Sequence, residues 1–415
     1  MENNSIPVAA PYIKDFEQLA FGMFVHFGLY SQLNKGEWVY HIHGLEMDSY
    51  RQLKNSFRVG SMQEIVNTAK SAGCKYITLT TRHHEGFSLY DTRGLTDFDI
   101  MHTPTGRDLV REFVDTCREA DIVPFFYHTT LDWYNKDFKG DFDTYLDYLY
   151  KSVEILCTNY GKIGGLWFDG NWSNKEADWK EERLYKMIHS YQPDAMIINN
   201  TGLGARGKIG LDEIDAVTYE RGMPKPLDLR GRSKYISGEM CETLCDHWGA
   251  ADDINFKPIK RLIEELCECR KVGANFLLNI GPSGDGSVSK MQQAIMECIG
   301  HWMRIYGKAI YNGRPYILYD DKREFLLRDV NDSKTAYLFK FNPNQADGDE
   351  NVSLELDGKK ALVLENIPET VSAVTWMDNN ENLNFKQEGN RVLINCTGYP
   401  YGQSLCVRVA QIQFQ

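Results

Sequence analysis

The sequence predicts a (β/α)8-like TIM barrel that is followed by a C-terminal antiparallel β-sandwich. The first observation is that short β-rich apolar runs alternate with longer amphipathic patterns through the first three quarters of the 415 residues. The second is that the remaining chain consists of short alternating runs separated by Asn, Asp and Gly. The length allows for a large barrel core and a second domain of about a hundred residues. We therefore expect domains at residues 1–313 and 314–415.

Eight apolar runs have the length and composition of parallel barrel strands. They are residues 22–28, 75–81, 123–129, 164–170, 195–200, 216–220, 234–240 and 275–281. Amphipathic helices are expected between most of these runs, for example at 61–73, 106–120 and 259–273. The interval 202–215 has room for only one short helix, so the barrel can lack a helix there.

The C-terminal part of the chain predicts a small sandwich of antiparallel strands. Its pattern changes after a helical segment at 291–306. The runs that follow are residues 337–341, 352–356, 361–366, 373–377, 391–395 and 405–412.

Composition excludes several classes of protein. Hydrophobic residues make up 42% and charged residues 25% of the chain, which is ordinary for a globular protein, and no apolar run is long enough to cross a bilayer. The net charge of −12 and the scattered Lys and Arg argue against a nucleic-acid partner.

Cysteine usage and the first residues bear on the compartment. The ten cysteines show no zinc-ligand spacing, so reduced structural thiols are expected. Residues 1–16 lack a basic region followed by an apolar stretch. We expect a cytoplasmic location, or a periplasmic or secreted one if a signal has been removed.

Polar side chains stand at the ends of six of the eight predicted strands. The carboxyl ends of barrel strands are where catalytic groups lie, and a purely structural barrel needs no such residues there. The side chains are His26, His83, His84, Glu85, Tyr127, His128, Asp132, Trp133, Trp167, Asp169, Glu220 and Glu239.

Asp169 is the most informative of these residues, because it emerges from the near-continuous apolar run GGLWF. Burying an unpaired carboxylate costs several kcal/mol, so an acid at this position indicates function. The alternative is a cap for the following helix. Residues 171–174 supply capping side chains of their own, which favours the functional interpretation.

A second carboxylate near Asp169 would satisfy the requirement of glycoside hydrolysis for a pair of acids. Glu220 ends a strand two positions further round the barrel, close enough in principle for the ~5–5.5 Å separation of a retaining enzyme. Its alternative is a surface side chain paired with Arg221. The other candidates for the second acid are Glu239, as the main rival, and the more distant Glu37 and Glu242.

The His83–His84 pair has two interpretations, a metal site or hydrogen bonds to sugar hydroxyls. No metal-ligand spacing accompanies the pair, so hydrogen bonds to sugar hydroxyls are the favoured interpretation. Either histidine could instead belong to the core. Four tryptophans lie near strand ends, namely Trp38, Trp133, Trp167 and Trp172. Each could pack against the apolar face of a sugar ring or belong to the hydrophobic core.

Five motifs in order make residues 21–286 resemble glycoside hydrolase family 29, the retaining α-L-fucosidases. They are FGMFVHFGLYS with GEW, the segment AKSAGCKYITLTTRHHEGFSLYDT, LWFDG, GEMCETLCDHWG and NFLLNIGPSGDG. The resemblance implies a distorted (β/α)8 barrel with a β-sandwich and a double-displacement mechanism without a cofactor. Asp169 would be the nucleophile and Glu220 the acid/base, with Glu239 more of a supporting residue. The fucose subsite would consist of His26, Glu37, Trp38, His83, His84, Tyr127 and Trp167.

Two departures from the family pattern concern specificity. His128 stands where many relatives have Ser, and we expect it to contact a hydroxyl or alter the neighbouring subsite. The segment INNTG lacks an Arg that some relatives use near the sugar.

The expected activity is release of L-fucose from fucosylated oligosaccharides or glycoconjugates. Two alternatives are a catalytically weak carbohydrate-binding protein on the same fold and a glycosidase for another sugar such as galactose.

Overall fold

The computed structural model describes residues 5–210, 213–342, 361–400 and 402–415. The chain divides into two compact units, one of residues 1–257 with 274–297 and one of 258–273 with 298–415. The predicted boundary between 313 and 314 coincides with the start of β9 at Gly313. That two domains meet between residues 313 and 314 remains a prediction.

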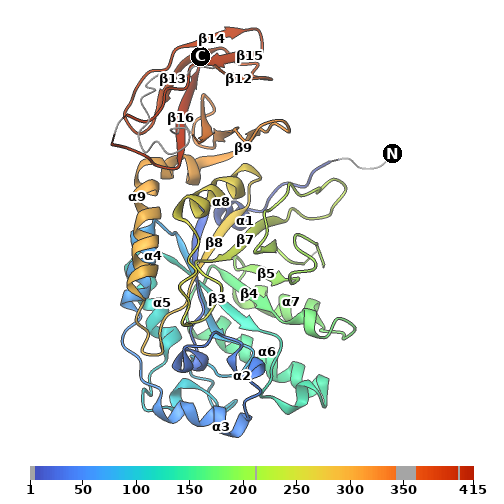
Figure 1. Ribbon diagram of the computed structural model, residues 1–415. Helices are drawn as coiled ribbons and strands as arrows, with labels where there is room; N and C mark the ends of the chain where they lie inside the picture. Colours follow the sequence, from blue (N-terminus) through green and yellow to red (C-terminus); the bar gives the residue numbers. More distant parts are fainter. Residues whose placement is uncertain (1–4, 211–212, 343–360, 401) are drawn as a thin grey trace. The chain divides into compact units, whose positions relative to one another are not determined.

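Eight parallel strands close into a barrel in the order β1 to β8, which confirms the predicted fold class (Figure 1). Their apolar side chains are buried on both faces, as expected for strands covered by helices. The strands are β1 (Phe21–Val25), β2 (Tyr76–Arg82), β3 (Val123–Thr129), β4 (Gly165–Asp169), β5 (Met196–Asn200), β6 (Ala216–Glu220), β7 (Ser237–Thr243) and β8 (Asn275–Ile280).

The seventh strand lies three residues later in the chain than the prediction of 234–240. Four of the seven residues from Ser237 to Thr243 are polar, so this segment lacks the apolar run that marks the other strands. All seven residues are nevertheless buried. Glu239 therefore lies inside the strand, where the sequence placed it near the end.

Two of the helices that connect the strands begin at an acidic cap. Asp108 accepts a hydrogen bond from the backbone N–H of Arg111 at the start of α5, and Asp141 does so from Thr144 at α6. Among the described residues of 202–215 there is no helix, as the sequence allowed. The helices are α1 (Pro11–Leu19), α2 (Val39–Ile42), α3 (Met47–Arg51), α4 (Gln63–Ala72), α5 (Leu109–Glu119), α6 (Phe142–Asn159), α7 (Glu181–Tyr191), α8 (Ile259–Lys271) and α9 (Lys290–Asn312).

Short 3₁₀ turns complete the loops of the barrel. They are η1 (Leu29–Leu33), η2 (Gln52–Ser56), η3 (Ile100–His102), η4 (Lys136–Phe138) and η5 (Asn171–Ser173).

Helix α1 covers the amino-terminal end of the barrel. Its Phe16 ring lies 5.8 Å from Tyr76 and 5.9 Å from Phe125 in the barrel interior. The backbone carbonyl of Phe16 also accepts a hydrogen bond from Asn275 at the start of β8. Because this end is filled, a ligand can enter the barrel only from the carboxyl ends of the strands.

The C-terminal strands form two antiparallel sheets, one in the order β13-β16-β11-β10-β9 and one in the order β12-β15-β14. They share one hydrophobic cluster that includes Leu338, Trp376 and Ile394, as in a sandwich. The predicted run 352–356 lies outside the described residues. The strands are β9 (Gly313–Ile317), β10 (Phe325–Asp329), β11 (Thr335–Phe341), β12 (Leu362–Leu364), β13 (Val371–Trp376), β14 (Phe385–Glu388), β15 (Arg391–Ile394) and β16 (Val407–Phe414).

Two further findings concern the membrane and the thiols. Within the described ranges, no helix combines the length and apolar character that a membrane crossing requires. All ten cysteines are free thiols.

Candidate active site

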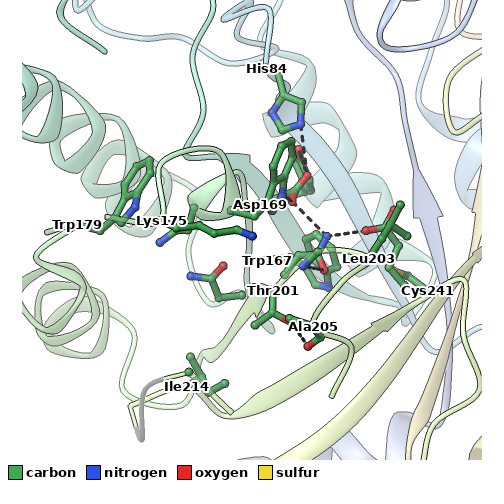
Figure 2. Close-up of a pocket in the computed structure, with 18 of the residues that line it drawn as sticks. His84, Trp167, Asp169, Lys175, Trp179, Thr201, Leu203, Ala205, Ile214 and Cys241 are labelled. Carbon is green, nitrogen blue, oxygen red and sulfur yellow. Dashed lines mark hydrogen bonds and ion pairs between the residues drawn. The ribbon is translucent and has the colours of Figure 1, made fainter. Parts of the chain in front are cut away.

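A cavity of about 1530 Å³ opens at the carboxyl ends of the barrel strands. Figure 2 shows Asp169 and Trp167 in its middle, with Trp179 and Ile214 on one side and Cys241 on the other. Nine of the predicted site residues line it, namely His26, Glu37, Trp38, His83, His84, Tyr127, Trp167, Asp169 and Glu220. Predicted residues from five different strands or their loops thus meet in one place.

Three donor groups and the ring of His84 surround the carboxylate of Asp169 at the end of β4. Its Oδ1 accepts from Nε1 of Trp172 at 2.7 Å and from Nδ2 of Asn200 at 3.2 Å. Its Oδ2 accepts from the Tyr127 hydroxyl at 3.1 Å and lies 3.4 Å from Nε2 of His84 (Figure 2). Burial by itself would raise the pKa of Asp169, but the contacts with His84, Trp172 and Tyr127 outweigh it and lower the pKa. Asp169 is therefore an ionised carboxylate near neutral pH.

Glu220, at the end of β6, has the opposite electrostatic environment. Its Oε2 accepts from Nδ2 of Asn200 at 2.9 Å. Burial raises the pKa of Glu220 and the charge of Asp169 raises it further, while Asn200, Arg221 and Arg206 oppose the increase. Asp169 and Glu220 thus have pKa values displaced in opposite directions, which suits Asp169 for a nucleophile and Glu220 for a proton donor.

His84 is oriented by a chain of hydrogen bonds. The hydroxyl of Thr129 donates to the carbonyl of Leu131, so its oxygen accepts from Nδ1 of His84 at 2.7 Å. The other ring nitrogen, Nε2, faces Asp169. That contact is attractive when Nε2 carries a proton.

His26 is held as a neutral acceptor. Nδ2 of Asn279 donates to the carbonyl of Trp248 at 2.7 Å, so Oδ1 of Asn279 faces His26 and accepts from its Nδ1 at 2.7 Å. Burial lowers the pKa of His26 to about 4. The neutral ring therefore keeps Nε2 as an acceptor that suits a sugar hydroxyl.

Two further predicted site residues, Glu37 and His83, have close polar neighbours within the protein. Oε2 of Glu37 accepts from the backbone N–H groups of Trp248 and Gly249 at 3.1 and 2.8 Å. Nδ1 of His83 lies 3.5 Å from Oε2 of the buried Glu85, whose pKa burial raises to about 8. Burial also lowers the pKa of His83, so its ring is neutral.

Glu239, the predicted rival for the acid/base, does not line the cavity. It is fully buried below Trp167, whose Nε1 donates to Oε1 at 2.8 Å, while the Tyr76 hydroxyl donates to Oε2 at 2.6 Å. The rival assignment does not fit because β7 continues four residues beyond Glu239, and the expectation of a supporting residue fits its position instead. Burial raises the pKa of Glu239 to about 7, and its contacts make it a support for Trp167.

The prediction that His128 contacts the sugar is also wrong. Neighbouring residues of a strand point to opposite faces, so Tyr127 faces the barrel interior and His128 faces α6. Its Nδ1 bonds to the carbonyl of Thr129 at 2.6 Å and its Nε2 to Ser152 of α6 at 2.8 Å. His128 does not line the cavity.

The predicted tryptophans separate into three that line the cavity and one behind them. Trp38, Trp167 and Trp172 are lining residues. The rings of Trp38 and Trp172 lie 6.1 Å apart and nearly parallel. Trp133 packs edge-on against Trp38 at 5.1 Å and is not among the lining residues.

The sequence analysis missed two asparagines that organise the site, Asn200 and Asn279. Each lies at or next to the end of an apolar strand and is almost fully buried, at 4% and 1% exposed. A polar amide at the end of such a run is a usable signal, because a buried amide must be hydrogen-bonded. Among the described residues, no group of three His, Cys, Asp or Glu side chains is arranged to hold a metal ion.

A sequence model of the family described as alpha-L-fucosidase matches residues 2–308, about three quarters of the chain. The chain belongs to the alpha-L-fucosidase family. The tissue alpha-L-fucosidase of Mus musculus is 27% identical over 357 residues, which cover 78% of this chain and 76% of the mouse protein. Family membership makes this protein a glycosidase that releases L-fucose from α-L-fucosides with retention of configuration.

Solved structures of alpha-L-fucosidases share the whole architecture. Isoenzyme 1 of Paenibacillus thiaminolyticus superposes with a TM-score of 0.81 at 27% identity, covering 98% of this chain and 99% of that one. A fucosidase of Bacteroides thetaiotaomicron gives a TM-score of 0.82 at 22% identity, with 100% and 97% of the two chains covered. The similarity to the Bacteroides thetaiotaomicron structure supports the fold of this chain.

Proposed function

We propose that Asp169 is the nucleophile and Glu220 the acid/base of this alpha-L-fucosidase, acting on fucosylated oligosaccharides or glycoconjugates. The observation that carries the assignment is that both carboxylates accept from one nitrogen, Nδ2 of Asn200, at 3.2 and 2.9 Å. The two oxygens therefore lie at most about 6 Å apart, which fits the ~5–5.5 Å of retaining enzymes and falls short of the ~6.5–9.5 Å of inverting ones.

In the first step, a carboxylate oxygen of Asp169 attacks the anomeric carbon of the fucoside. The bond from that carbon to the leaving oxygen breaks, and Glu220 gives its proton to this oxygen. The products are a fucosyl ester on Asp169, a Glu220 carboxylate and the free aglycone.

In the second step, Glu220 removes a proton from a water molecule that attacks the same carbon. The ester bond breaks, fucose leaves and Asp169 becomes a carboxylate again. Formation of the ester removes the negative charge of Asp169, which is one of the causes that raise the pKa of Glu220. The pKa of Glu220 therefore falls when it must act as a base.

The other lining groups are suited to hold a monosaccharide next to Asp169. Neutral His26 and His83 offer ring nitrogens for sugar hydroxyls, and Trp167 forms an apolar floor beneath them. The whole cavity, at about 1530 Å³, exceeds the ~300–1,000 Å³ of common small-molecule sites. This volume supports an oligosaccharide or glycoconjugate as the substrate.

Replacement of the nucleophile tests the assignment. Asp169→Ala should lower turnover of an aryl α-L-fucoside by about 10⁴-fold or more. Azide should restore part of the rate by attacking from the vacated side, with a β-fucosyl azide as the product. The matched control is Asp178→Ala, which removes an exposed carboxylate of the same cavity and should keep the rate within about twofold. No azide product would remove Asp169 from the nucleophile role.

A further inference from the structure

Asn200 lies between the two acids and has no role in the steps above. It ends β5, the strand between β4 and β6, and is directly paired with Asp169 in the register of the sheet. Its side chain is almost fully buried at 4% exposed. It nevertheless lines the cavity.

The orientation of the Asn200 amide is determined by two donors. Its Oδ1 accepts from the hydroxyl of Thr218 at 2.9 Å and from the backbone N–H of Gly202 at 3.2 Å. The N–H of Gly202 can only donate, and the turn that presents it uses a positive φ of 80°, which favours glycine. The NH₂ group therefore faces the acids.

In this orientation, the two hydrogens of the amide NH₂ group point to two different carboxylates. One points to Oδ1 of Asp169 and the other to Oε2 of Glu220. Because Oε2 accepts a hydrogen bond, the proton of the neutral Glu220 is more stable on the other oxygen, Oε1. The amide thus distinguishes the two oxygens of the acid.

We propose that Asn200 is a positioning residue that holds the nucleophile and the acid/base at their working separation and directs the catalytic proton to Oε1 of Glu220. This inference rests on the proposed roles of Asp169 and Glu220. Other groups facing Glu220 are Asp169 on β4, Arg206 before β6, Arg221 after it and the Cys241 thiol on β7. Asp169 itself is faced by His84, Tyr127 and Trp172.

The experiment compares pH profiles of kcat/KM for wild-type protein and Asn200→Ala, with an aryl α-L-fucoside as substrate. The amide favours the ionised form of both acids, so its loss should move the acidic and the basic limb upward, each by about one pH unit. The loss of rate should be about 10- to 100-fold for a poor leaving group and smaller for dinitrophenolate, because proton delivery is impaired.

Two further variants make the experiment decisive. Thr218→Val removes a donor to Oδ1 of Asn200 without touching either acid, and should shift both limbs in the same direction by less. It replaces Asn200→Ala if that protein does not fold. Asn199→Ala is the matched control, because the Nδ2 of this neighbour donates to Glu181 and Tyr185 instead. It should leave both limbs in place.

The outcomes separate this inference from the proposed function. A bell-shaped profile in wild type with unchanged limbs in Asn200→Ala and Thr218→Val would overturn the role of Asn200 alone. Equal shifts in Asn199→Ala would also overturn it, because they would indicate a general disturbance of β5. A basic limb that persists in Glu220→Gln would instead contradict the assignment of the acid.

Discussion

Glu220 is partly buried and Glu239 fully buried on neighbouring strands, and burial raises the pKa of both. In the register of the sheet, Glu220 pairs with Cys241, two residues beyond Glu239. That offset amounts to about 6–7 Å along a strand. It puts Glu220 at the cavity and Glu239 beneath its floor. Depth along the strand, more than residue type or pKa, determines which glutamate can reach a substrate.

The hydrogen bonds of Glu220 and Glu239 also distinguish a residue that can react from one that supports the site. Tyr76 and Trp167 donate to the two oxygens of Glu239, so both are occupied by the protein. Asn200 donates to Oε2 of Glu220, and Oε1 is left for proton transfer. Glu239 therefore supports the site, while Glu220 keeps an oxygen that can transfer a proton.

Of the two glutamates, Glu220 should have the larger effect on activity when it is removed. Glu220→Ala should lower kcat/KM by about 10³-fold for a fucosyl oligosaccharide but only about 10-fold for a dinitrophenyl fucoside, which needs no proton to depart. Glu220→Gln should abolish the basic limb of the pH profile, which reflects deprotonation of the acid. Measuring kcat/KM of Glu220→Ala on both substrates tests this difference. Equal losses on the two substrates would contradict the role of Glu220 as the acid that distinguishes it from Glu239.

A smaller effect is expected for Glu239→Gln, and it should appear mainly in stability. The folded-state pKa of about 7 lies above the ordinary glutamate value of 4.5, so the stabilisation is complete below pH 4.5 and is lost as the pH rises through 7. Wild type should lose on the order of 3 kcal/mol across this window through this residue.

Urea unfolding at pH 4.5 and pH 8 measures this change. The variant should show a smaller loss of stability than wild type, with kcat/KM reduced at most about tenfold and equally for both leaving groups. A leaving-group dependence as steep as that of Glu220→Ala would show that Glu239 reaches the substrate.

The smallest effect on rate is expected on the outer face of β3. His128→Ala should keep kcat/KM within about twofold while reducing stability by about 1–3 kcal/mol, because Ser152 loses one of its two buried partners and keeps only Tyr90. Tyr127→Phe, at the adjacent position, removes a donor to Asp169 and should lower kcat/KM about tenfold and raise the acidic limb. A larger loss of rate in His128→Ala than in Tyr127→Phe would contradict the assignment of faces.

The sequence was sufficient for the barrel because its strands are buried on both faces and appear as apolar runs. Asp169 could be identified from the same logic, as an acid where such a run ends. The position of Glu239 could not, because the end of β7 depends on pairing with its neighbours and not on its own polar sequence. The outward direction of His128 was available from strand alternation with Tyr127.

Asn200 could not be assigned a role in advance for a different reason. Its function depends on two carboxylates that are far away in sequence and meet only when β4, β5 and β6 lie side by side. An amide also has no charge or pKa that would identify it from its own residue type. Hydrogen-bond direction, which only coordinates supply, reveals it.

The most direct test of the central claim is to identify the residue that carries the fucosyl ester. The protein would be treated with a 2-fluoro-fucosyl fluoride, which slows hydrolysis of the ester, then digested and analysed by peptide mass spectrometry. The structure predicts one adduct, on Asp169, and none in Asp169→Ala. An adduct on Glu220 or Glu239 would contradict the division of roles between the acids.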